Sequence, residues 1–157
     1  MIKAESIGNT SLVCSLLYDA KIRRYLEECA STLATTYSSG DERGGENEVI
    51  TTDLRHKCTS KHTGTSAAAP LAAGIIALTL EANPSLSWRD VMFLTVITSR
   101  AQAIRSNQFI VNKRGFAVSS RYGFGLMDAG RMVELAKTWR TVPRMQSCST
   151  LNSNFKE

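Results

Sequence analysis

The sequence has no pair of closely spaced cysteines and little histidine. None of the four cysteines, at positions 14, 29, 58 and 148, forms a CxxC pair, and the chain has only two histidines. A structural zinc site needs several such ligands at short spacings, so the sequence argues against one. Two disulfides and four free thiols both agree with the cysteine count, which therefore does not assign a redox compartment.

Long apolar runs are also missing. The longest candidate, residues 67–80, has 14 residues, fewer than the roughly 18 that a membrane helix needs. The N-terminus has only a short apolar stretch, residues 11–17, and does not have the pattern of a signal peptide. The net charge of +5 is spread along the chain rather than gathered in a basic run with aromatics. We therefore expect neither a membrane segment nor nucleic-acid binding.

The chain is long enough for one domain and hydrophobic enough for a core, since 43% of its 157 residues are hydrophobic. Residues 32–38 and 49–53 have the composition of strands and are separated by a polar, glycine-rich loop. A short strand is expected near 116–118. Helices are expected from about 66 to 83, from Ser87 to about Ser99 behind a capping box, and from Asp128 to about Trp139. Strands that alternate with helices predict an α/β fold, although about three strands make an unfinished sheet.

The first of these helices has no polar face, which predicts burial on every side. Its small residues permit close approach by neighbours, and Pro70 should bend or loosen its start. In the second helix, spacings of three predict that four apolar residues face the core: Trp88, Val91, Leu94 and Ile97.

The sequence Gly64-Thr65-Ser66 stands where the first helix begins. A serine there lies among backbone N–H groups without helical partners and at the positive end of the helix dipole. Its own N–H is able to stabilise an oxyanion, and the glycine before it allows a sharp turn. Such a serine suits nucleophilic catalysis, but serines that only cap helices are common, so composition alone leaves both interpretations open.

The neighbouring residues favour the nucleophile. The stretch from His62 to Pro70, HTGTSAAAP, resembles the serine motif of the subtilases, and its histidine resembles the furin/kexin branch. The resemblance continues through residues 29–40, 50–66, 71–91, 122–130 and 138–143. It implies a partial subtilisin-like α/β fold: a few strands, a buried serine-bearing helix and two further helices, with the N-terminal half of the sheet missing. Residues 1–24 form a divergent segment, 25–143 a partial peptidase domain, and 144–157 a loose tail toward an absent β-sandwich domain.

The resemblance also implies residue roles. Ser66 matches the nucleophile, with its N–H directed at the oxyanion, whereas His62, Gly64, Thr65 and Pro70 match structural positions of the motif. In subtilases the catalytic aspartate, the histidine base and an oxyanion asparagine precede the serine. The 65 residues before Ser66 contain no motif that resembles them. We therefore expect a chain that carries the nucleophile alone and is inactive by itself.

The cysteines and one glutamate match further family positions. Cys29 and Cys58 match cysteines whose disulfide partners lie upstream, and Cys148 matches one whose partner lies in the β-sandwich domain. Glu27 stands where furin-like enzymes have a calcium ligand. Calcium needs six to eight oxygens, so we expect calcium in a full-length family member and none bound by this chain. A plain surface glutamate is the alternative for Glu27.

Two functional hypotheses follow. By resemblance, the chain belongs to a serine-type endopeptidase of the secretory pathway, in the Golgi membrane or secreted, which processes proprotein substrates after paired basic residues. The alternative is a non-catalytic, truncated product with no activity. A weaker third hypothesis is a fragment that binds the substrates or the other half of such an enzyme.

Overall fold

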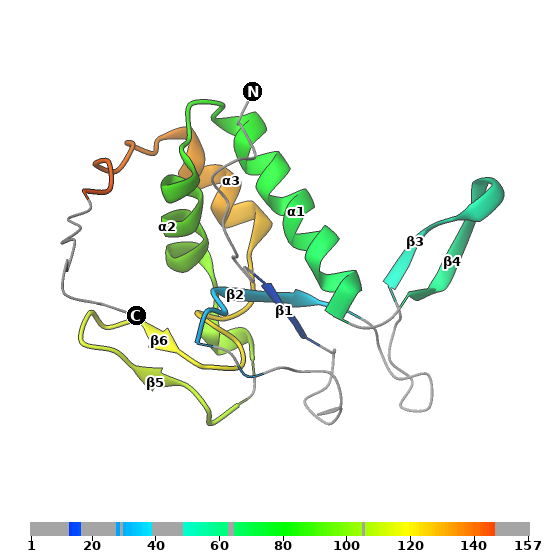
Figure 1. Ribbon diagram of the computed structural model, residues 1–157, viewed down its shortest axis with the longest axis horizontal. Coiled ribbons are helices and arrows are strands. Elements are labelled where there is room, and N and C mark those ends of the chain that lie inside the picture. Colours follow the sequence, from blue (N-terminus) through cyan, green and yellow to red (C-terminus); the bar gives the residue numbers. More distant parts are fainter. Residues whose placement is uncertain are drawn as a thin grey trace, which may run out of the picture.

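The computed structural model describes residues 13–16, 28, 30–38, 49–62, 65–104 and 106–146, with the backbone alone for 13–16, 65 and 66. Figure 1 shows three helices beside a small sheet and two hairpins. The strands are β1 (Val13–Leu16), β2 (Ala34–Tyr37), β3 (Val49–Asp53), β4 (Lys57–His62), β5 (Ile110–Val111) and β6 (Ala117–Val118). The helices are α1 (Thr65–Ala82), α2 (Trp88–Thr98) and α3 (Ala129–Lys137).

The strand β2 lies at the centre of the sheet. On one side β1 pairs with it in parallel, from Val13 opposite Ala34 to Leu16 opposite Tyr37. On its other side runs the segment 124–127, in which the Met127 N–H donates to the Thr35 carbonyl at 2.9 Å. This segment in turn bridges Arg100, whose N–H donates to the Leu126 carbonyl at 2.8 Å. Sequence reasoning predicted β2 but missed β1, which lies in the divergent N-terminal segment.

Gly125 makes this close approach possible. Its φ of +115° lies in a region that residues other than glycine avoid. A Cβ at this position would overlap the backbone of Arg100 and Ala101. Only glycine therefore lets the segment 124–127 run between β2 and Arg100.

The hydrophobic core lies between the helices and β2. The helix α1 packs on β1, β2 and α3, and α2 packs on α3. The core residues come from β2, the three helices and the loops beside them: Ala34, Ala72, Leu86, Val91, Leu94, Met127, Met132 and Ala136. The expectation that Val91 and Leu94 face the core is confirmed, but Trp88 and Ile97 are 41% and 37% exposed. A stripe of residues three apart drifts around a helix of 3.6 residues per turn, so its ends leave the buried side.

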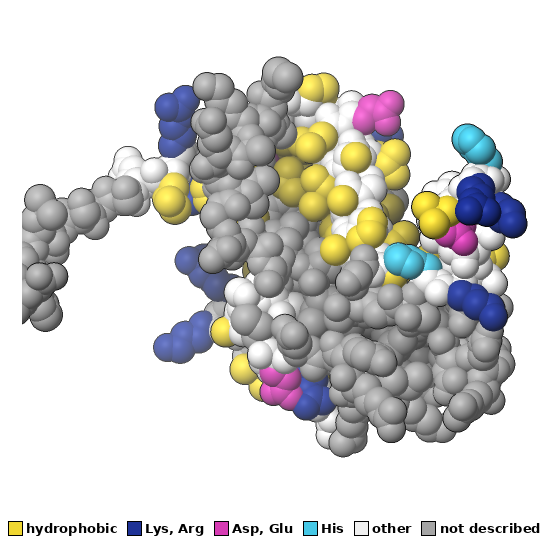
Figure 2. Space-filling view, turned by 45° about the vertical axis from the view of Figure 1, so that its right-hand side comes forward, with side chains coloured by type: hydrophobic (Ala, Val, Ile, Leu, Met, Phe, Trp, Pro, Cys, Tyr) yellow, Lys and Arg dark blue, Asp and Glu magenta, His cyan; other side chains and the backbone are white. Residues whose placement is uncertain are grey.

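The prediction that α1 is buried on every side is corrected within the described residues. Its buried positions are Ala67, Ala68, Ala72 and Thr79, whereas Leu71 and Leu78 are 40% and 52% exposed. Figure 2 shows apolar side chains gathered along this exposed side. The helix also continues through Pro70 without a break. No helix among the described residues is long and apolar enough to cross a membrane.

A buried carboxylate ties α2 to the chain that follows α3. Asp90 has no exposed surface, and its oxygens accept hydrogen bonds from the Ser87 N–H at 2.7 Å, the Trp139 indole at 2.9 Å and the Val142 N–H at 2.8 Å. The capping box predicted at Ser87 is thereby confirmed. Burial raises the pKa of Asp90, but the hydrogen bonds lower it by more, so the pKa lies below its ordinary value.

The hairpin of β3 and β4 projects away from this body (Figure 1). None of its residues, 49–62, is buried. Its turn contains Arg55 and His56, both with positive φ. The antiparallel ladder pairs Thr52 with Cys58 and Asp53 with Lys57, with an irregularity between Val49 and Thr51. Within the described residues the hairpin is therefore held by its own ladder, whose second strand sequence reasoning missed.

Candidate active site

The serine that sequence analysis singles out is the second residue of α1. The helix begins at Thr65, so the N–H of Ser66 is one of the first four donors, which have no acceptor inside the helix. The positive end of the helix dipole lies at the same place. The chain therefore presents a hydroxyl-bearing residue at a helix N-terminus, whether or not its hydroxyl acts as a nucleophile.

Pro70 has a specific effect on this first turn. In an α-helix the N–H of residue 70 would donate to the carbonyl of residue 66, and proline has no N–H. The Ser66 carbonyl therefore lacks its usual helical donor, while the helix itself continues. The backbone around Ser66 is thus less constrained by helical hydrogen bonds than it is one turn later.

The strand β2 holds the start of α1 in place. The Thr36 hydroxyl donates to the Ala68 carbonyl at 2.8 Å, and this hydrogen bond is buried. Ala67 and Ala68 are 2% and 0% exposed, so the first turn lies directly on the sheet. Sequence reasoning did not identify Thr36, although a threonine in a predicted strand next to a small-residue helix is a reasonable candidate for such a contact.

The two histidines lie on the projecting hairpin. His62 is the last residue of β4 and half-buried, opposite Val49. His56 is exposed at the turn, where Asp53 accepts a hydrogen bond from the Leu54 N–H at 2.7 Å. Among the described residues, no hydrogen bond or ion pair joins either imidazole to a carboxylate. The histidine–aspartate pair of a serine protease is thus not found in this part of the chain.

The buried carboxylate of Asp90 is remote from Ser66. It follows the loop after the C-terminal end of α1, and Ser66 lies at the other end (Figure 1). A helix of this length is about 27 Å long, so Asp90 does not reach the site. Asp128 also has partners away from Ser66, because it caps α3 and forms an ion pair with Arg100 at 3.1 Å.

Several predicted residues lie outside the described part of the chain, namely Glu27, Cys29, Gly64 and Cys148. The neighbour of the first two, Glu28, forms an exposed ion pair with Arg121. Cys58 is an exposed free thiol on β4. Among the described residues no group of three or more potential ligands is placed to hold a metal ion, so these residues do not by themselves supply a calcium site.

A separate cavity lies between α2 and α3. Its six lining residues come from the end of α2, from α3 and from the residue that caps α3: Ile97, Thr98, Arg131, Glu134, Leu135 and Thr138. None of them belongs to α1 or the hairpin, so this cavity is not part of the arrangement around Ser66.

Comparison with known proteins gives the family context. The family described as "Subtilase family" matches residues 25–125. The chain is 61% identical over 124 residues to human proprotein convertase subtilisin/kexin type 5, and 57% identical over 124 residues to human furin. It is 50% identical over 152 residues to proprotein convertase subtilisin/kexin type 5 of Branchiostoma californiense. The matches cover 79% of the chain for the human proteins and 88% for the Branchiostoma protein.

The same comparisons show how small a part of these relatives the chain represents. The matches span 7%, 15% and 9% of the three proteins, respectively. Among solved structures, the serine protease of Aeromonas sobria in complex with its chaperone superposes with a TM-score of 0.67 at 20% sequence identity. That match covers 84% of this chain and 30% of the protease chain, and it supports the predicted partial subtilisin-like α/β fold.

Proposed function

Because the chain belongs to the subtilase family, as a furin/kexin-type member, we propose that it is the nucleophile-bearing segment of a serine endopeptidase. Ser66 attacks the carbonyl carbon of the scissile peptide bond, and the Ser66 N–H donates to the oxyanion that forms. The observation that carries the proposal is the position of this serine, at the start of α1 inside the family motif HTGTSAAAP.

The surroundings of α1 support this role. The hydrogen bond from Thr36 to the Ala68 carbonyl fixes the first turn on β2. The backbone N–H groups of that turn are preorganised by the helix, and preorganised donors stabilise developing negative charge without rearranging during the reaction.

The base and its orienting carboxylate come, in this proposal, from residues other than these 157. His56 and His62 both lie on a hairpin with no buried residue, and neither has a carboxylate partner among the described residues. A base that is not held by a second group loses the correct tautomer and orientation. The same reasoning favours a second candidate function, in which the 157-residue chain by itself has no catalytic activity.

Two of those relatives are named as proprotein convertases, so we assign proproteins as substrates. Cleavage after paired basic residues and action in the secretory pathway are assigned from the resemblance to the furin/kexin branch. Calcium is proposed as a cofactor of the full-length enzyme, as the family resemblance implies. No catalytic step is routed through it.

A chimera tests the nucleophile. Residues 25–146 replace the matching segment of human furin, and turnover of a fluorogenic peptide that ends in Arg-Arg is measured with calcium. We expect turnover in the chimera and a fall of about 10⁶-fold in the Ser66→Ala version, the size of effect seen when a triad serine is removed. Thr65→Ser is the matched control, because it keeps a hydroxyl next to the nucleophile and changes only one methyl group.

The isolated chain is assayed in parallel. We expect no turnover above the Ser66→Ala background, with or without calcium. A folded chimera that is inactive overturns the role of Ser66. Turnover by the isolated chain that disappears in Ser66→Ala overturns the proposal that the base lies elsewhere.

A further inference from the structure

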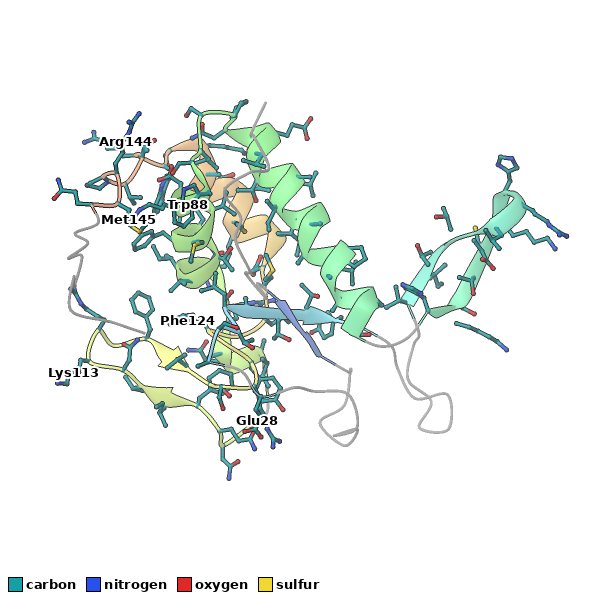
Figure 3. All side chains as sticks on the ribbon, in the orientation of Figure 1. Glu28, Trp88, Lys113, Phe124, Arg144 and Met145 are labelled. Atoms are coloured by element: carbon teal, nitrogen blue, oxygen red, sulfur yellow. The ribbon has the colours of Figure 1, made fainter. Side chains whose placement is uncertain are left out.

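The hairpin of β5 and β6 carries a pair of adjacent basic residues at its turn. Lys113 and Arg114 are both exposed and are the one such pair in the part of the chain that the structure describes. Figure 3 shows the labelled Lys113 at the outer end of this hairpin, away from the helices. The pair is thus presented to other molecules rather than to the body of the chain.

Neither basic side chain has an ion-pair partner among the described residues. The ion pairs among the described residues join Arg100 to Asp128, Arg121 to Glu28 and Lys137 to Glu134. Lys113 and Arg114 take part in none of them. Their charges are therefore available to the carboxylates of a partner, and such complementary charges speed association and fix the register of binding.

The turn itself is held by four hydrogen bonds, all made by Asn112, one of them from its own N–H to the Phe116 carbonyl at 2.9 Å. The Asn112 side chain accepts from the N–H groups of Arg114 at 2.9 Å and Phe116 at 3.0 Å, and the Gly115 N–H donates to the Asn112 carbonyl at 2.9 Å. Gly115 has a φ of +83°. A hydrogen bond exposed to water contributes only about 0.5–1.5 kcal/mol, and the two strands have only two residues each. The turn therefore opens at small cost.

Two aromatic contacts confine this opening to the turn. Phe109 stacks on Tyr122 with ring centroids 5.9 Å apart, and Phe116 meets Phe124 edge to face at 6.0 Å. Between these contacts, Ile110 and Val111 are already 71% and 73% exposed, so little apolar surface is lost from the core when the turn opens. The six residues 110–115, once extended, span about 20 Å, which is long enough to lie across the cleft of an endopeptidase.

We propose that the Arg114–Gly115 peptide bond is a processing site for a serine endopeptidase with acidic pockets for two adjacent basic side chains. Water adds across this bond: the bond between the Arg114 carbonyl carbon and the Gly115 nitrogen breaks, leaving a carboxylate on Arg114 and an ammonium group on Gly115. The inference rests on the proposed function in one respect: the protease that we assign is a complete endopeptidase of the same furin/kexin type.

The two products stay together after cleavage. Fragment 115–157 contains the segment 124–127, which pairs with β2 and Arg100, and α3, which packs on α1. Asn83 also donates to the Ala136 carbonyl at 2.9 Å, and Asp90 binds Trp139 and Val142. The cleaved chain is therefore a two-fragment complex with new charged ends at the hairpin.

The experiment treats the full 157-residue chain with a kexin-type endopeptidase and follows the products by mass spectrometry. Arg23→Gln and Arg24→Gln are included in every sample to remove the other adjacent basic pair. We expect fragments 1–114 and 115–157 as the first products, eluting together in size-exclusion chromatography and separating only in denaturant. Lys113→Gln and Arg114→Gln should each slow cleavage at least about tenfold, since each removes one charge that the protease recognises. The control Lys137→Gln should leave the rate unchanged.

First cleavage at isolated basic residues such as Arg140, or an unchanged rate in Lys113→Gln, overturns the inference. The furin chimera repeats the measurement in a complete catalytic domain. A chimera that is active but stays intact at Arg114 when the protease is added overturns the processing site and leaves the proposed function standing. An inactive chimera that is cleaved after Arg114 overturns the proposed function and leaves the processing site standing.

Discussion

The strand β4 ends three positions before α1 begins. Different forces nevertheless hold the β3–β4 hairpin and the helical body together. In the body, Leu94, Met132 and Ala136 are completely buried, and three helices share one core with β2. In the hairpin no residue is buried, and Ile50 and Leu54 are 75% and 82% exposed. A two-stranded hairpin without a packed face is marginally stable in water.

The candidate nucleophile lies where these two regions meet. The strand β4 ends at His62, and α1 begins at Thr65. The chain from Ser66 onward is therefore packed on the core, through β2 and the first turn of α1, whereas the chain before Thr65 leads to a hairpin that depends on its own ladder. Catalysis needs the nucleophile to be held in a defined geometry, and in our proposal further residues complete the site.

The largest expected difference between the two regions is in side-chain truncation. Met132→Ala removes a fully buried side chain from the core and should lower the free energy of unfolding by about 2–5 kcal/mol. Leu54→Ala, at the exposed turn of the hairpin, should change it by no more than about 0.5 kcal/mol. Urea unfolding followed by circular dichroism measures both. Equal effects would show that the hairpin is packed as the body is.

The next largest effect concerns Asp90. Asp90→Asn replaces an oxygen that accepts hydrogen bonds with an amide NH₂ group, which then faces the N–H donors of Ser87 or those of Trp139 and Val142. A buried donor left unpaired costs about 1–3 kcal/mol. We expect that loss in thermal or urea unfolding, together with faster hydrogen exchange at Val142. Asp53→Asn, on the hairpin, serves as the exposed control.

Acid should remove the same contribution gradually. The pKa of Asp90 is raised by burial but lowered by more by its hydrogen bonds, so its folded value lies below the ordinary 3.8. The stability it provides is therefore complete above about pH 3.8 and is lost as the pH falls through the folded pKa. The gap in unfolding free energy between the wild type and Asp90→Asn should narrow below that pH. A gap that widens in acid contradicts the direction of the shift.

The smallest effect distinguishes the exposed side of α1 from its buried side. Gly74 lies in mid-helix, and a Cβ there would have no atom within 4 Å. Gly74→Ala should therefore stabilise the chain by about 0.5–1 kcal/mol, through helix propensity alone. Gly125→Ala is the matched comparison and should destabilise the chain, because its Cβ would overlap the Arg100 backbone. Destabilisation by Gly74→Ala would mean that another surface covers this side of α1.

Much of the fold was predictable where the pattern is local. The capping box at Ser87 and the cap at Asp128 marked the starts of α2 and α3 correctly, because capping depends on residues within one turn. The strand β2 was recognised by its threonines and tyrosine. The strands β1, β4 and β5 were missed, since β1 is stabilised by pairing with β2 and the other two carry polar or exposed residues without clear alternation.

The candidate site was predictable in part. The motif around Ser66 was sufficient to identify the family and the position at a helix start. The contact from Thr36 to the Ala68 carbonyl was missed, because its two residues are 32 positions apart and the only local signal is a threonine in a predicted strand. The roles of Glu27, Cys29, Gly64 and Cys148 stay predictions.

The sequence alone determined which residues begin α2 and α3, where the serine stands in the first turn of α1, and which family motif surrounds it. These depend on neighbours along the chain, whose interactions act over a few residues. The tertiary structure decided which side of α1 is buried, that Asp90 holds Trp139 and Val142, and that both histidines stand on a hairpin with no buried residue. Those outcomes depend on packing between distant segments, and a nearly uniform apolar helix carries no pattern that tells one of its sides from another.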